Sequence, residues 1–223
     1  MPANDIAAPA PLPNVAALLE KKRTIHILAI GSSSTIGVGA SSGLKSYPTQ
    51  LGDILEKALK DVDVEIVNRG VSGEVAESTA DRIRSEVALS KPDLVLWQLG
   101  TNDALSRVSP EEFESTVRDT IKWLKGDGID VVLVGMQYSA RLAKDQNYLA
   151  IRQVLQKIAT EENILYVRRY DAMQFIAHTR ANLQLMASDN FHLNDLGYQC
   201  MAEHVARAVI VNLFVRRLKS LSN

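Results

Sequence analysis

Short apolar runs rich in Ile, Val and Leu recur along the chain, and longer segments with apolar residues every three to four positions separate them. Such near-continuous runs are typical of strands that are buried on both faces, as in a parallel sheet. The predicted strands cover residues 25–30, 64–67, 93–99, 131–134 and 164–167.

The segments between these strands predict amphipathic helices over residues 48–59, 77–89, 144–160 and 196–219. A further helix begins at Ser109-Pro110-Glu111-Glu112, a capping box with proline at the first helical position. Alternating strands and helices predict an α/β protein, a three-layer α/β/α sandwich with a five-stranded parallel sheet of flavodoxin-like type. Ligands of such folds bind beyond the carboxyl ends of the strands.

A length of 223 residues fits one domain. We expect residues 1–24 to be an N-terminal tail and lead-in, and residues 25–223 to form a single domain. The stretch from Pro2 to Pro13 holds four of the seven prolines and predicts a loose tether. A tail of this kind is compatible with a trimmed export signal, which favours a periplasmic or secreted location over a cytoplasmic one.

The composition of the chain excludes several classes of partner and site. With 25 Lys+Arg against 26 Asp+Glu, the chain lacks the excess positive charge that nucleic acid binding requires. The single cysteine, Cys200, excludes an internal disulfide framework and a cysteine-based zinc site. No apolar stretch approaches the ~18 residues of a membrane span, so we expect no integral membrane segment. The oligomeric state is not readable from the sequence.

Polar residues follow the predicted strands where chemistry is expected. The first strand runs into Gly31-Ser32-Ser33-Ser34, the second leads to Gly73-Glu74, and the third to Gly100-Thr101-Asn102-Asp103. Near the C-terminus, Asp189 precedes His192 by three residues, a spacing that allows the carboxylate to orient the imidazole ring. Each motif alone has an ordinary structural interpretation as a turn or a cap.

Other chemistries match less well. A nucleotide-binding flavodoxin-like protein fits the predicted fold, but Leu44 separates Gly43 from Lys45 in the one near match to a phosphate-binding loop. A mononuclear metal site would have to use Asp189, His192 and Asp195, a remote alternative. We therefore expect neither a metal nor another cofactor.

Taken together, the four blocks resemble the SGNH hydrolases, also called GDSL esterases and lipases, from about Ile27 to the final helix. The resemblance implies a catalytic triad and an oxyanion hole. The implied triad is Ser33, His192 and Asp189, and the implied oxyanion hole is Ser33, Gly73 and Asn102. Ser32 stands where the family usually has the aspartate of G-D-S, which is not the triad acid.

The implied activity is that of a serine esterase acting on short-chain acyl esters. The expected substrate is a small-molecule or saccharide ester, with deacetylation of a carbohydrate favoured. Loops 136–141 and 170–188 are expected to line the pocket, and Tyr138 is a candidate substrate-binding residue. The alternatives are a lysophospholipase, an acyl thioesterase, or a non-catalytic acyl- or carbohydrate-binding relic.

Overall fold

A single six-stranded sheet organises the computed structural model, which describes residues 7–21, 23–180 and 182–220, with side chains through residue 213. The strand order is β1-β6-β5-β4-β2-β3. The strands are β1 (Ala7–Ala8), β2 (Ile25–Gly31), β3 (Val64–Gly70), β4 (Leu94–Gln98), β5 (Asp130–Val134) and β6 (Leu165–Val167). Strands β2 to β6 pair in parallel, and β1 pairs antiparallel with β6.

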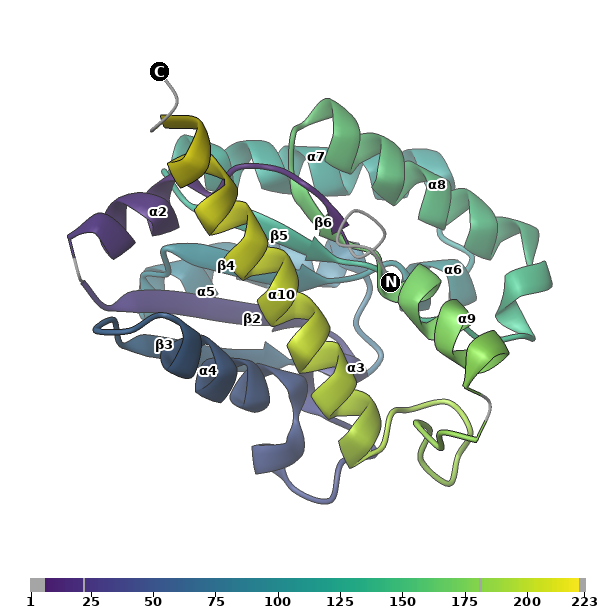
Figure 1. Ribbon diagram of the computed structural model, residues 1–223. Coiled ribbons are helices and arrows are strands. Elements are labelled where there is room, and N and C mark those ends of the chain that lie inside the picture. The colour runs from purple at the N-terminus through teal and green to yellow at the C-terminus, as the bar shows by residue number, and fades with distance from the viewer. Residues whose placement is uncertain (1–6, 22, 181, 221–223) are drawn as a thin grey trace.

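Helices cover both faces of the sheet, which is the middle layer in Figure 1. One face carries α2 (Pro13–Glu20), α4 (Tyr47–Ala58) and α10 (Asp195–Ser220), and the other carries α5 (Ala76–Ser90), α7 (Pro110–Gly126) and α8 (Gln146–Glu161). Successive strand residues face opposite layers, so Ile27 belongs to one apolar cluster and Leu28 to the other. Burial on both faces explains why the strands read as continuous apolar runs. The predicted three-layer α/β/α class is confirmed.

The predicted elements agree with the structure to within a few residues at their ends. The capping box is also present, since Ser109 Oγ accepts a hydrogen bond from the Glu112 N–H at 3.2 Å. Three short elements at the carboxyl edge of the sheet were not predicted as helices: α3 (Ser33–Ile36), α6 (Thr101–Leu105) and η1 (Gly43–Lys45). In the described part of the chain, no helix is both long and apolar enough to cross a bilayer.

The segment after β6 differs from its prediction as a loop over residues 170–188. Helix α9 (Arg169–Thr179) occupies most of its first half. The apolar residues of α9 do not form one continuous stripe, so its sequence lacks the periodicity that marks helices such as α4 and α7.

The N-terminal segment also differs from the expected loose tether, because residues 7–20 pack against the sheet. Strand β1 adds an antiparallel edge, and Val15 in α2 is buried. The Asp130 carboxylate accepts hydrogen bonds from the Val15 N–H at 3.0 Å and from Asn14 Nδ2 at 3.1 Å. Residues 1–6 of the proline-rich stretch lie outside the described residues. A single domain over residues 25–223 stays a prediction.

Candidate active site

Ser33 begins the short helix α3 directly after β2. The backbone approaches it through Gly31, whose φ is +146° and where an added Cβ would meet the Gln98 carbonyl oxygen at 2.3 Å. Gly37 closes the helix with a φ of +97°. The sharp strand-to-helix turn leaves the Ser33 side chain half-buried at the edge of the sheet.

Ser32, the residue in place of the family's usual aspartate, points into the protein. It is 5% exposed, and its Oγ donates to Gln98 Oε1 at 2.9 Å. The same amide oxygen accepts from the Ser32 N–H at 3.2 Å and from Thr35 Oγ1 at 3.3 Å. Ser32 thus ties the turn to the end of β4, and its hydroxyl is already engaged as a donor.

His192 lies between Asp189 and Ser33, and its contact with Asp189 is the one that their three-residue spacing allows. His192 Nε2 is 3.1 Å from Ser33 Oγ, and His192 Nδ1 is 2.5 Å from Asp189 Oδ2. Asp189 Oδ1 accepts from the backbone N–H groups of Phe191 and His192, both at 2.9 Å. The hydrogen bond from His192, followed by these backbone bonds, lowers the pKa of the Asp189 carboxyl to about 2. An ionised Asp189 can only accept, so Nδ1 carries the proton and Nε2 is left to accept from Ser33.

Gly73 and Asn102 come from the turns after β3 and β4. Gly73 has a φ of +80°, which favours glycine, and an added Cβ would meet no atom within 4 Å. Asn102 Nδ2 donates to the Glu74 carbonyl oxygen at 2.9 Å. An amide nitrogen has two hydrogens, so Asn102 can hold the Gly73–Glu74 turn with one and keep the other for a ligand.

Asp103, adjacent to Asn102, holds these two turns together from the interior. It is 1% exposed and accepts from the Ala76 N–H at 2.7 Å and from the Gly100 N–H at 3.0 Å. Burial raises the pKa of the Asp103 carboxyl against the lowering effect of these donors. The sequence-based interpretation of this residue as a cap agrees with its bond to Gly100, whereas its bond to Ala76 in another element was not predicted.

The block after His192 joins its loop to the serine-bearing segment. Asn194 Nδ2 donates to the Gln184 and Met186 carbonyl oxygens at 2.8 and 3.1 Å, and the Tyr198 hydroxyl donates to the Val38 carbonyl at 2.7 Å. Asp195 accepts from the N–H and Oγ of Ser41 at 2.7 and 2.6 Å.

Asp195 therefore faces Ser41 and does not join Asp189 and His192. Among the described residues, no group of three His, Cys, Asp or Glu side chains is placed to hold a metal ion. The structure therefore does not bring Asp189, His192 and Asp195 together as one set of ligands.

Aromatic side chains lie beside the histidine. Phe191 meets the His192 ring edge-on, with centroids 5.1 Å apart. Tyr138, the candidate substrate-binding residue, is half-buried and packs edge-on against Tyr170 at 5.3 Å. The Gln137 side chain, next to Tyr138, donates to the Phe191 carbonyl at 3.4 Å, so this loop is on the His192 side of the site.

The chain was also compared with known protein families and structures. The model of the Non-GDSL lipase-like family matches residues 1–213. The chain belongs to this family. Like its relatives, it is an ester-hydrolysing enzyme of the SGNH type.

Two curated relatives and one solved structure illustrate the likeness of this family member. It is 25% identical over 187 residues to an arylesterase of Vibrio mimicus, covering 84% of this chain and 89% of the relative. It is 24% identical over 192 residues to an acetylxylan esterase of Geobacillus stearothermophilus, covering 80% and 84%. A two-domain esterase active on acetylated mannans superposes with a TM-score of 0.78 at 18% identity, covering 95% of this chain and 56% of that protein.

Proposed function

We propose that this enzyme is a serine esterase that hydrolyses short-chain acyl esters, with Ser33 as nucleophile, His192 as general base and Asp189 as its orienting acid. The observation that carries the proposal is the continuous contact from Asp189 Oδ2 through His192 to Ser33 Oγ, at 2.5 and 3.1 Å. A serine hydroxyl is a weak nucleophile, and an adjacent imidazole that accepts its proton activates it.

In this mechanism Ser33 Oγ bonds to the ester carbonyl carbon while its proton moves to His192 Nε2. Asp189 stabilises the imidazolium that forms. His192 then returns the proton to the departing alcohol, and a water molecule, deprotonated by His192, releases the acid from the acyl-enzyme. The enzyme ends in its starting state.

The negative charge of the tetrahedral intermediate requires donors that are already in place. We assign this role to the N–H groups of Ser33 and Gly73 and to the second N–H of Asn102. The first turn of a helix leaves its N–H groups without intrahelical partners, which applies to Ser33. The positive φ of Gly73 and the fixed amide of Asn102 support the assignment.

Two exposed aliphatic side chains, Ile36 and Val71, lie on segments that adjoin Ser33. Ile36 lies one turn beyond Ser33 in α3, and β3 ends against it, since an added Cβ at Gly70 would meet the Ile36 nitrogen at 2.1 Å. Ile36 and Val71 are each 47% exposed. We assign to these two side chains the contact with a short acyl group such as acetyl or butyryl.

For the alcohol side we propose a saccharide. Rings such as Phe191 and Tyr138 offer apolar surface next to polar groups, the combination common in small-molecule sites. The names of two relatives, an acetylxylan esterase and an esterase active on acetylated mannans, support the same choice.

The test compares wild type with Ser33→Ala on p-nitrophenyl acetate, butyrate and octanoate, and then on acetylated xylo- and manno-oligosaccharides. We expect turnover of the two short esters, release of acetate from at least one oligosaccharide, and a loss of about 10⁴-fold or more in Ser33→Ala. Ser32→Ala is the matched control, because it removes the neighbouring serine hydroxyl and leaves Ser33, the proposed nucleophile, in place. A preference for octanoate would support a lysophospholipase or acyl thioesterase instead, and equal rates in wild type and Ser33→Ala would refute the mechanism.

A further inference from the structure

Arg169, the first residue of α9, places a guanidinium group in the interior. It is 3% exposed, and among the described residues its Nε and Nη1 have no hydrogen-bond partner. The ionisable groups that act on it are the hydroxyls of Tyr47, Tyr148 and Tyr198, which are neutral at pH 7. Burial lowers the pKa of Arg169, yet arginine keeps its charge in proteins. A buried cation without a carboxylate costs stability, so its presence calls for another reason.

The contacts of Arg169 lead to both sides of the catalytic pair. Its Nη2 donates to Ser34 Oγ at 3.1 Å and to Gln137 Oε1 at 3.2 Å. Ser34 directly follows Ser33 in α3. One nitrogen atom of Arg169 therefore contacts both the nucleophile-bearing helix and the loop after β5.

Gln137 extends the contact to the histidine loop. Because a guanidinium can only donate, the amide oxygen of Gln137 has to face Arg169, and its Nε2 has to point away. That Nε2 donates to the carbonyl of Phe191, the residue before His192, at 3.4 Å. The Gln137 backbone is itself fixed, since the Tyr148 hydroxyl donates to its carbonyl at 2.6 Å.

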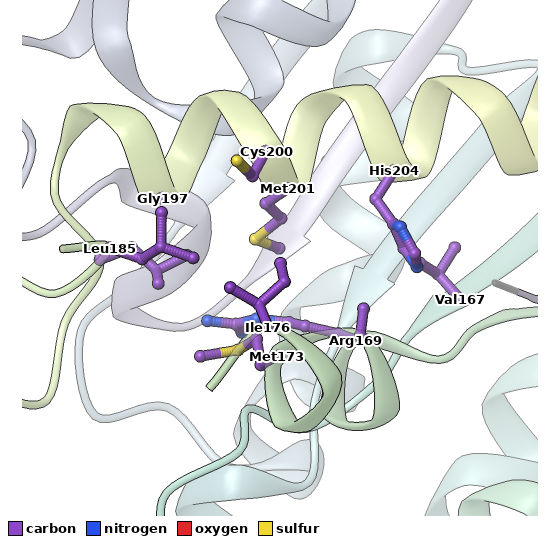
Figure 2. A pocket seen from close by; sticks show the side chains of 11 residues that line it. Val167, Arg169, Met173, Ile176, Leu185, Gly197, Cys200, Met201 and His204 are labelled. Atoms are coloured by element: carbon purple, nitrogen blue, oxygen red, sulfur yellow. The ribbon is translucent and has the colours of Figure 1, made fainter. Parts of the chain in front are cut away.

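A cavity beside Arg169 does not explain the charge. Figure 2 shows Arg169 entering the space between α9 and α10, across from Cys200 and Met201. The cavity measures about 50 Å³ and is otherwise mainly apolar. Ligand pockets measure roughly 300 Å³ or more, so an acyl substrate does not fit there.

We propose that Arg169 is a positioning residue, which holds Ser33 and His192 at reacting distance through Ser34 on one side and through Gln137 and Phe191 on the other. The inference rests on the proposed function of Ser33 and His192. Its physical basis is that a small displacement of reacting groups costs far more in rate than in stability.

The test measures kcat, KM and the melting temperature of Arg169→Met with p-nitrophenyl acetate. We expect kcat to fall about 10- to 100-fold while KM changes less than about threefold. The melting temperature stays the same or rises, because the substitution removes an uncompensated buried charge.

Arg152→Met is the matched control. Arg152 pairs with Asp171 at 2.6 Å and stacks over the Tyr170 ring at 4.4 Å, away from Ser34 and Gln137. It should show the reverse pattern, a lower melting temperature with kcat unchanged.

The relay through Gln137 is tested with Gln137→Met and with the double variant Gln137→Met/Arg169→Met. If both residues act along one path, the double variant falls less in kcat than the product of the two single effects. Arg169→Lys keeps the charge without the planar fork and should lie between wild type and Arg169→Met. If Arg169→Met does not fold, Arg169→Lys tests the positioning role instead, by the same criterion that kcat falls while KM changes little.

Wild-type kcat in Arg169→Met, or a fall in kcat that merely follows a fall in melting temperature, would overturn the inference. Activity that Ser33→Ala abolishes and Arg169→Met leaves intact would reject the positioning role and keep the proposed function. A wild type without ester turnover would reject the proposed function itself.

Discussion

The turn that carries Asn102 and the loop that carries His192 approach the same serine from two sides but are anchored in different ways. The turn rests on Asp103, a buried carboxylate that accepts two backbone N–H groups. In the loop, Asp189 has a side chain 47% exposed, and it accepts from the backbone of its own loop. Loss of a buried anchor such as Asp103 should affect both folding and activity. Loss of an exposed anchor such as Asp189 should affect activity without a comparable effect on folding. Changes in the turn should therefore reduce both stability and activity, and changes in the loop should reduce activity alone.

The largest effect is expected for His192→Ala, on the loop side. Loss of the base should lower kcat about 10⁴- to 10⁶-fold. The melting temperature should change little, because the side-chain hydrogen bonds of His192 go to Asp189 and Ser33, which are not fully buried and can bond to water instead. Ester kinetics and a thermal melt on the same preparation measure kcat and the melting temperature. A large drop in melting temperature would contradict the claim that the loop affects activity without affecting stability.

Asn102→Ala, on the turn side, should lower kcat about 10²- to 10³-fold, the usual cost of one oxyanion donor. It also removes the hydrogen bond to the Glu74 carbonyl, which should cost about 1 kcal/mol of unfolding free energy.

Asn147→Ala is the control for that experiment. Asn147 donates to the carbonyl oxygens of Ala104 and Val108 at 3.2 and 3.3 Å, within and just beyond α6. A similar loss of stability with unchanged kcat would assign the activity loss in Asn102→Ala to the missing donor. Equal kcat losses in both variants would reject that assignment.

Asp103→Asn should reduce the unfolding free energy by about 1–3 kcal/mol, since one of the two N–H groups now at Asp103 would lose its acceptor in the interior. Urea denaturation measures this cost. Asp189→Asn is the comparison on the loop side and should lower kcat with a smaller change in unfolding free energy. Equal stability losses would show that the two anchors are alike.

The smallest effect is a pH dependence of opposite sign in the two regions. The pKa of Asp103 is raised above 3.8, so the wild-type unfolding free energy gains from proton uptake as the pH falls through that raised value. The stability gap between wild type and Asp103→Asn should widen on acidification. The pKa of Asp189 is lowered from 3.8 to about 2, so its contribution is complete above 3.8 and is lost as the pH falls toward 2.

The gap between wild type and Asp189→Asn should therefore narrow under the same conditions. Denaturation curves of the three proteins between about pH 7 and pH 3 measure both gaps. Gaps that move in the same direction would contradict the assigned pKa shifts.

The parts of the fold that could be predicted from the sequence are those that leave a periodic pattern or a short motif in it. The five parallel strands and the main helices follow from apolar patterns that burial on one or two faces imposes. The pairing of Asp189 with His192 followed from their three-residue spacing, whereas their placement beside Ser33 was implied only by the family resemblance. The two-residue strand β1 was missed because a pairing that short leaves no periodic signal.

The supporting residues were not predictable in the same way. Nothing in Arg168-Arg169 indicates which arginine is buried, and Gln137 gains its role only where the loop after β5 meets Phe191. The role of Ser32 likewise depends on Gln98, which lies 66 residues away in the chain. Such contacts depend on tertiary structure, which local propensity does not encode.

The most direct test of the central claim is to identify the atom that an ester-like phosphonate modifies. A p-nitrophenyl alkylphosphonate should form one bond between phosphorus and Ser33 Oγ, release p-nitrophenolate, and pass the serine proton to His192. Intact mass and peptide mapping should show a single adduct on Ser33, absent in Ser33→Ala and formed far more slowly in His192→Ala. An adduct on Ser32, Ser34 or another residue, or ester hydrolysis that continues without any adduct, would contradict the account.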